Sequence, residues 1–160
     1  MNRTRILAID GGGIKGIVPA VVLSHLEKLL QDLSNNPSSR IHDYFDLFSG
    51  ASTGAIIVAG LLSPDNNNRP KYSSKEILDL YLENGEIIFN SSLFQGIKSV
   101  SGIVNVKYSP EGIESVFEKY FGHSELKNIL KPSLIPVYDL SRGKNYFFRQ
   151  QKAINSQRHN

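Results

Sequence analysis

A short apolar segment, a glycine-rich turn and an apolar helical segment follow one another twice within the first 62 residues. The first copy is ILAIDGGGIKG followed by IVPAVVLSHLEKLL, and the second is YFDLFSGASTG followed by AIIVAGLL. Two strands connected through a helix lie parallel in one sheet, and such crossovers are right-handed in nearly all proteins. The repeated pattern therefore predicts an α/β fold with a mainly parallel sheet.

The apolar spacing locates the remaining elements. Residues 5–9 are expected as a buried parallel strand because their apolar run is continuous. Helices are predicted over residues 17–30, 55–62, 73–89 and from Ser109 to Gly122, and two further strands over residues 133–140 and 144–150. In the first helix one apolar face is predicted from the helical spacing of Val18, Val22, Leu26, Leu29 and Leu30. In the helix over residues 73–89 the apolar face is predicted to carry Ile77, Leu80, Tyr81 and Ile88. Residues 90–108, rich in serine and glycine, are expected to form an ordered loop or a lid-like segment.

Length and composition indicate a single domain, residues 1–160, with its own core. The chain has no cysteine and a net charge of +3. Its start lacks the apolar stretch of a secretory signal, and no run approaches the ~20 apolar residues of a membrane-spanning helix. We therefore expect a cytoplasmic protein or one bound peripherally to a membrane.

The last part of the chain is basic. No acidic residue follows Asp139, whereas the sequence there contains Arg142, Lys144, Arg149, Lys152 and Arg158. Such a tail could contact an anionic lipid surface or a nucleic acid. The simpler interpretation, a solvated end, is favoured, and no nucleic-acid partner is expected.

The first glycine turn, DGGGIKG, fits the pattern GxGxxG through Gly11, Gly13 and Gly16. Its position between a strand and a helix suits a dinucleotide-binding turn. That interpretation also needs a second strand ending in an acid about twenty residues later, where this sequence has a helix end and a loop. Asp10 would also place negative charge beside a pyrophosphate.

The same turn also suits an oxyanion hole. Consecutive glycines let the backbone N–H groups of Gly11, Gly12 and Gly13 point into a site at a helix N-terminus, where negative charge is favoured. Lys15 could add positive charge or brace the loop. A purely structural role, a tight turn from strand to helix, is the third interpretation.

The second turn places one serine between glycines. Gly50, Ser52 and Gly54 fit the pattern GxSxG, in which a serine at a sharp strand-to-helix turn acts as a nucleophile. The backbone N–H of Thr53 could then join the oxyanion hole. A serine before a helix is also a common N-cap, but the strand, the helix and the separate glycine loop favour the nucleophile.

A serine nucleophile needs a base. A catalytic triad in the chain order serine, acid, histidine would need a histidine after Ser52. Only His123 and His159 follow Ser52, and both are expected to be ordinary surface residues. His25 and His42 precede the serine and do not fit this order.

At these residues the sequence resembles the patatin-like phospholipases, lipid acyl hydrolases with a serine–aspartate dyad. The resemblance rests on ILAIDGGGIKGIVPAVVLSHLEKL and FDLFSGASTGAIIVAGL, and continues more loosely through YSPEGIESVFEKYFG and LIPVYDLSRGKNYFF. It implies a three-layer α/β/α domain and hydrolysis of acyl esters through an acyl-serine. Phospholipids or related lipids would be the substrates, and no metal or organic cofactor would be required.

The resemblance assigns Ser52 as the nucleophile, and Gly11, Gly12, Gly13 and Gly16 with Lys15 as the oxyanion loop. The family's base is an aspartate in a later Asp-Gly-Gly or Asp-Gly-Ala turn, but no Asp-Gly follows Ser52 here. The domain is therefore expected to be incomplete at its C-terminus, with self-association through exposed strand edges. Two alternatives to a lipid acyl hydrolase stay open: a silent lipid-binding module without the base, and a nucleotide-binding domain.

Overall fold

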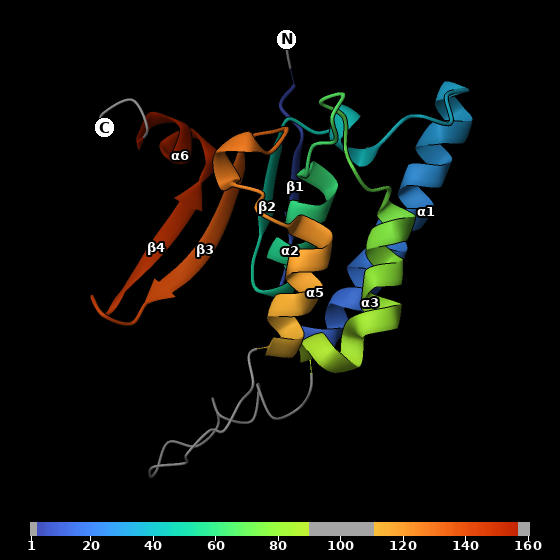
Figure 1. Ribbon diagram of the computed structural model, residues 1–160. Helices are drawn as coiled ribbons and strands as arrows, with labels where there is room; N and C mark the ends of the chain where they lie inside the picture. Colours follow the sequence, from blue (N-terminus) through green and yellow to red (C-terminus); the bar gives the residue numbers. More distant parts are fainter. Residues whose placement is uncertain (1–2, 90–110, 157–160) are drawn as a thin grey trace.

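The computed structural model describes residues 3–89 and 111–156 of the chain (Figure 1). Its strands are β1 (Ile6–Ile9), β2 (Leu47–Gly50), β3 (Ser133–Asp139) and β4 (Lys144–Arg149). Its α-helices are α1 (Ile17–Ser34), α2 (Thr53–Leu62), α3 (Ser74–Phe89), α5 (Glu111–Phe121) and α6 (Gln150–Ser156). Short 3-10 helices are η1 (Gly13–Gly16), η2 (Ile41–Asp43) and η3 (Leu126–Asn128).

The four strands form one sheet in the order β1-β2-β3-β4. β1 pairs with β2 in parallel, with Ile9 opposite Gly50, and β2 pairs with β3 in parallel. β4 returns antiparallel to β3 as a hairpin. The predicted mixed α/β class with a mainly parallel sheet is thus confirmed.

The core lies between this sheet and the helices on one side of it. In Figure 1, α1, α2, α3 and α5 stand together beside the sheet, and α6 lies against the hairpin of β3 and β4. Phe48 of β2 and Tyr81 of α3 are among the largest fully buried side chains. The predicted buried positions of α3 are confirmed for Ile77, Leu80, Tyr81 and Ile88. Of the three expected layers, the described residues show the sheet and this helical layer.

The predictions for β1 and for the face of α1 were wrong in part. β1 pairs on one side only among the described residues, and Ile6 is 58% exposed. Val18 and Val22 of α1 are also exposed, because the buried face of this helix carries Ala20, Leu23 and Glu27 instead. Helical spacing alone identifies an apolar stripe, but the position of the neighbouring elements decides which stripe is buried.

Glu27 is a buried carboxylate that connects three elements. Its side chain accepts hydrogen bonds from the backbone N–H of Ile41 in η2 at 3.1 Å and from that of Ser74 at 2.9 Å. It also accepts one from the Ser74 hydroxyl at 3.0 Å. A buried charge is tolerated when donors surround it in this way. Glu27 therefore fixes α1 against the start of α3.

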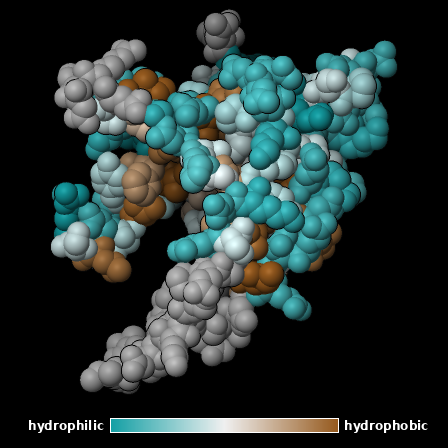
Figure 2. All heavy atoms as spheres, viewed as in Figure 1, coloured by the Kyte–Doolittle hydropathy of each residue, from teal (hydrophilic) through white to brown (hydrophobic). Residues whose placement is uncertain are grey.

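The hairpin of β3 and β4 carries apolar side chains at the surface, which Figure 2 shows as brown atoms over these strands. Its exposed large residues are Tyr138, Leu140, Phe147 and Phe148. The strands of this hairpin were predicted, whereas α6 was not. The loop or lid expected over residues 90–108 lies outside the described residues. Within the described ranges, no helix has the length and apolar content needed to cross a bilayer.

Candidate active site

The glycine turn and Ser52 meet at one edge of the sheet. β1 and β2 run parallel, so the turns that follow them leave the sheet at the same end. Gly11 lies directly against the second turn: a Cβ on Gly11 would sit 2.7 Å from Ser52 Cβ and 2.6 Å from the carbonyl oxygen of Ala51. Only a residue without a side chain permits this approach.

Ser52 has the backbone of a strained turn rather than of a helix cap. Its φ of 51° and ψ of −119° are unusual for a residue with a side chain. A capping serine is typically in the β region and its hydroxyl accepts a bond from the first helical turn, but Ser52 makes no such side-chain bond. Ser52 is also exposed, whereas Thr53 beside it is buried. The geometry therefore speaks against the N-cap interpretation.

The glycines around Ser52 let the two turns pack closely. A Cβ on Gly54 would lie 2.2 Å from the carbonyl oxygen of Ile9, and one on Gly50 would lie 2.3 Å from that of Gly54. The turn itself is closed by a hydrogen bond from the Gly54 N–H to the Ala51 carbonyl at 2.8 Å. The spacing of the GxSxG pattern thus has a steric cause on both sides of Ser52.

The glycine loop passes through the 3-10 helix η1 into α1. Gly13 takes a positive φ of 59°, which glycine adopts without strain, and the Lys15 N–H closes the turn on the Gly12 carbonyl at 3.2 Å. Lys15 is exposed and Gly16 is buried. Within the described part of the chain, the N–H groups of Gly12, Gly13 and Thr53 have no hydrogen-bond acceptor. They are donors available to a ligand.

An apolar groove begins at this loop. It has a volume of about 450 Å³ and lies between β1 and α1. Its walls include Leu7, Val18 and Val22, and Gly12 and Lys15 also line it. Of the three free N–H groups, the one of Gly12 thus belongs to a residue of this groove.

Comparison with known proteins assigns the chain to a family. The sequence matches the profile of the patatin-like phospholipases over residues 7–158. The chain belongs to this family. Patatin-17 of Solanum cardiophyllum is 36% identical over 151 residues, 94% of this chain and 37% of that protein. Patatin-like protein 4 of Arabidopsis thaliana is 36% identical over 152 residues, 95% of this chain and 38% of that protein. The chain thus spans just over a third of the length of these patatin relatives.

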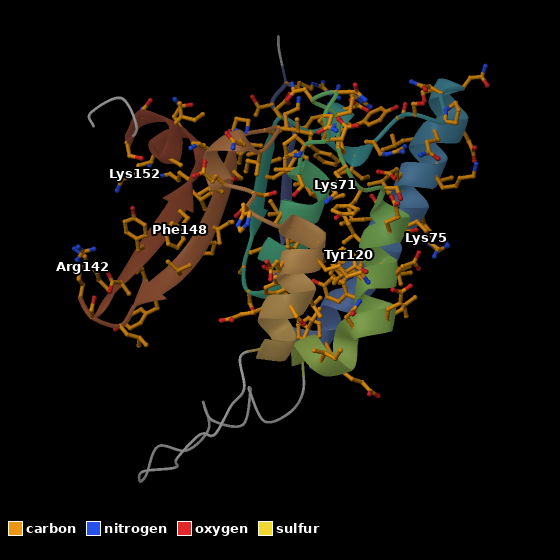
Figure 3. All side chains as sticks on the ribbon, viewed as in Figure 1. Lys71, Lys75, Tyr120, Arg142, Phe148 and Lys152 are labelled. Atoms are coloured by element: carbon orange, nitrogen blue, oxygen red, sulfur yellow. The ribbon has the colours of Figure 1, made fainter. Side chains whose placement is uncertain are left out.

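In this patatin-like chain the aspartates that follow Ser52 have structural partners. Asp65 closes a turn by accepting N–H bonds from Asn67 and Arg69. Asp79 pairs with Lys75 one turn away on α3. Asp139 accepts bonds from Ser141 and Arg142 at the end of the hairpin, which Figure 3 shows with Arg142 projecting away from the helices. Among the described residues, none of these aspartates bonds to Ser52.

The histidines do not assemble a triad in the described residues. His123 is exposed directly after α5, and His159 lies outside the described residues. His42 is buried in η2, where its Nδ1 lies 3.2 Å from Asp43 Oδ1 without forming a hydrogen bond. Burial lowers the pKa of His42 below its ordinary value of 6.5, although the nearby Asp43 carboxylate opposes this. No cluster of metal-ligating side chains occurs within residues 3–89 and 111–156.

Two buried residues have partners that no local sequence signal indicates. Tyr81 is predicted only as a core position, but its hydroxyl donates a hydrogen bond to the Thr53 carbonyl at 2.8 Å. Glu27 lies on a face of α1 that the apolar spacing does not select, and it bonds to Ile41 and Ser74. These contacts join residues far apart in the sequence, so no local pattern could identify them.

Proposed function

We propose that the chain is the nucleophile-bearing part of a lipid acyl hydrolase and that Ser52 is its nucleophile. One observation carries the proposal: Ser52 is exposed, strained and free of a capping bond, and it lies against a loop whose N–H groups have no acceptor among the described residues. Strained serines of this kind are typical of nucleophile elbows. Free N–H donors beside a serine are typical of an oxyanion hole.

In the proposed reaction, Ser52 Oγ forms a bond to the ester carbonyl carbon of a lipid. The negative charge that develops on the carbonyl oxygen is stabilised by the N–H groups of Gly12, Gly13 and Thr53, at the N-terminal ends of η1 and α2. The ester C–O bond then breaks, and the alcohol leaves with the serine proton. Water attacks the acyl-serine, which releases the fatty acid and restores the hydroxyl.

The proton of Ser52 must pass through a base, and Asp65, Asp79 and Asp139 each bond to partners other than Ser52. The family resemblance implies an aspartate of an Asp-Gly turn for this role, and no Asp-Gly follows Ser52 in the sequence. A serine without its base retains only the contributions of the oxyanion hole and of binding. The second candidate function, a lipid-binding module without turnover, follows from this observation.

The groove beside the glycine loop supports a lipid over a nucleotide. Its walls are mainly apolar and include Leu7, Val18 and Val22, which suit an acyl chain. Gly11 packs against Ala51 and Ser52, which closes the glycine turn onto the second turn. Peripheral membrane contact and self-association stay predictions.

The test is labelling with a fluorophosphonate, which reacts with activated serines, followed by peptide mass spectrometry. We expect one adduct, on Ser52, which disappears in Ser52→Ala. Ser63→Ala is the matched control, because Ser63 lies at the other end of α2 and its hydroxyl bonds to the Ala59 carbonyl. Labelling elsewhere, or none on the folded protein, would contradict the nucleophile. Hydrolysis of p-nitrophenyl esters then distinguishes the two candidate functions. An enzyme hydrolyses them and loses this activity in Ser52→Ala, whereas a binding module does not hydrolyse them.

A further inference from the structure

Tyr81 is a buried tyrosine of α3 that reaches the turn carrying Ser52. Its side chain is 1% exposed, and its hydroxyl donates a hydrogen bond to the carbonyl oxygen of Thr53 at 2.8 Å. A buried hydroxyl needs such a partner, because an unpaired polar group in a core is costly. The partner here is the residue directly after Ser52, and its N–H is one of the free donors of the site.

The ring of Tyr81 also touches the other half of the site. A Cβ on Gly16, the last residue of η1, would lie 2.9 Å from Tyr81 Cε1 and 2.5 Å from Thr53 Oγ1. Gly16, Thr53 and Tyr81 therefore meet at one point. The glycine loop, the start of α2 and the middle of α3 are packed together there without space for an added methyl group.

A second contact along α3 supports the same loop. A Cβ on Gly85, one helical turn after Tyr81, would lie 2.9 Å from Ile14 Cδ1 in η1. The ring of Tyr81 also stacks on that of Phe89, with centroids 5.5 Å apart. α3 thus presents one rigid surface to η1 and to Thr53.

From these contacts we infer that Tyr81 is a positioning residue, which sets the distance between Ser52 and the N–H donors of the glycine loop. Its hydroxyl holds the carbonyl of Thr53, in the peptide that follows the one carrying the Thr53 N–H, and its ring packs against Gly16. Tyr81 does not touch substrate and is not a catalytic residue. The inference rests on the proposed function for its effect on reactivity, but the packing it describes can be measured separately.

The protonation of Tyr81 agrees with this role. Burial raises the pKa of its phenol to about 12. The hydroxyl therefore keeps its proton, and its hydrogen bond to Thr53, throughout the range in which an esterase is assayed.

The experiment compares Tyr81→Phe with Tyr72→Phe. Each substitution removes one hydroxyl that donates to a backbone carbonyl, since Tyr72 bonds to the carbonyl of Tyr120, a residue labelled on α5 in Figure 3. The rings stay, so core packing is preserved in both. Three quantities are measured: the amide NMR signals, the rate constant of fluorophosphonate labelling at Ser52, and the free energy of unfolding.

We expect both variants to lose a similar amount of stability. Only Tyr81→Phe should shift the amide signals of Gly12, Gly13 and Thr53, and only it should slow labelling, by about tenfold, which corresponds to the net contribution of one hydrogen bond. Unchanged amide signals in Tyr81→Phe would overturn the inference, and so would equal effects of Tyr72→Phe on the site.

Gly16→Ala keeps the test decisive if Tyr81→Phe does not fold. Its methyl group would meet Tyr81 Cε1 at 2.9 Å and Thr53 Oγ1 at 2.5 Å, and both of these side chains are buried. The inference requires shifted amide signals of Gly12, Gly13 and Thr53 and slower labelling in this variant, and would fail if these amide signals do not move. If the wild-type protein is not labelled, the proposed function fails, whereas the amide signals still decide the role of Tyr81.

Discussion

Gly11 lies so close to Ser52 that a Cβ on the glycine would stand 2.7 Å from the Cβ of the serine. The two residues follow different strands, yet they form one contact at the edge of the sheet. A side chain at position 11 would therefore displace Ser52, the proposed nucleophile. This contact explains why the glycine loop and the GxSxG turn act as one unit.

Gly11→Ala is expected to slow fluorophosphonate labelling of Ser52 by about 100-fold or more, because a displacement of about 1 Å in a reacting group has an effect of this size. Gly12→Ala is the comparison. Gly12 has an extended φ of 173°, and its nearest contact would be Lys15 Cβ at 3.4 Å, so an alanine fits there. If labelling slowed as much in Gly12→Ala as in Gly11→Ala, crowding of Ser52 would not be the cause of the slower labelling.

Gly54→Ala is expected to destabilise the fold by about 3 kcal/mol or more, since its methyl group would meet the carbonyl oxygen of Ile9, which the parallel sheet holds in place. Gly60→Ala, in the same helix, would meet only the Ile77 side chain, at 2.9 Å. That side chain can move, and alanine favours the helix. Chemical denaturation should therefore show a much smaller change for Gly60→Ala; equal changes would refute the steric explanation.

Glu27→Gln is expected to reduce the free energy of unfolding by about 2–3 kcal/mol, because a buried carboxylate that accepts three hydrogen bonds is replaced by an amide with one acceptor oxygen. The amide nitrogen would also face an N–H group of Ile41 or Ser74. Glu83→Gln, at an exposed position of α3, serves as control. A loss in Glu27→Gln no larger than in Glu83→Gln would contradict the proposed connection between α1 and α3.

His42 predicts a dependence of stability on pH. Because burial lowers the pKa of His42 in the folded protein below 6.5, the unfolded chain binds the proton more readily. The stability is therefore fully present above pH 6.5 and decreases as the pH falls through the lowered pKa, by at most about 1.4 kcal/mol per pH unit. The pKa of Asp43 is also lowered: burial opposes this shift, but the hydrogen bonds from the Arg69 guanidinium and the Arg40 N–H outweigh burial. Protonation of Asp43 therefore causes a further loss of stability at more acidic pH.

Urea denaturation between pH 8 and about pH 5 measures this dependence. His42→Gln should flatten it, since glutamine does not titrate. His25→Gln, at an exposed position of α1, controls for the loss of an imidazole as such. Identical pH profiles for the two variants would disprove the assignment to His42.

Much of the site follows from local sequence. The strand-turn-helix pattern occurs twice, and the residues in each turn, three consecutive glycines in one and Gly-Ala-Ser-Thr-Gly in the other, predict a sharp turn from strand to helix. Parallel pairing of β1 and β2 then brings the two turns together. Such features can be read from a sequence because each depends on the residue types within a few positions.

Other features were decided by packing between distant residues. The positions of the neighbouring elements decide which face of α1 is buried. They leave Val18 and Val22 exposed. The Tyr81 hydrogen bond to Thr53 joins residues 28 positions apart, and periodicity can predict that Tyr81 is buried but not what its hydroxyl meets. That Ser52 is a strained turn residue instead of a helix cap is also a tertiary fact, because the contacts of Gly11 and Gly54 with the neighbouring turns hold it there.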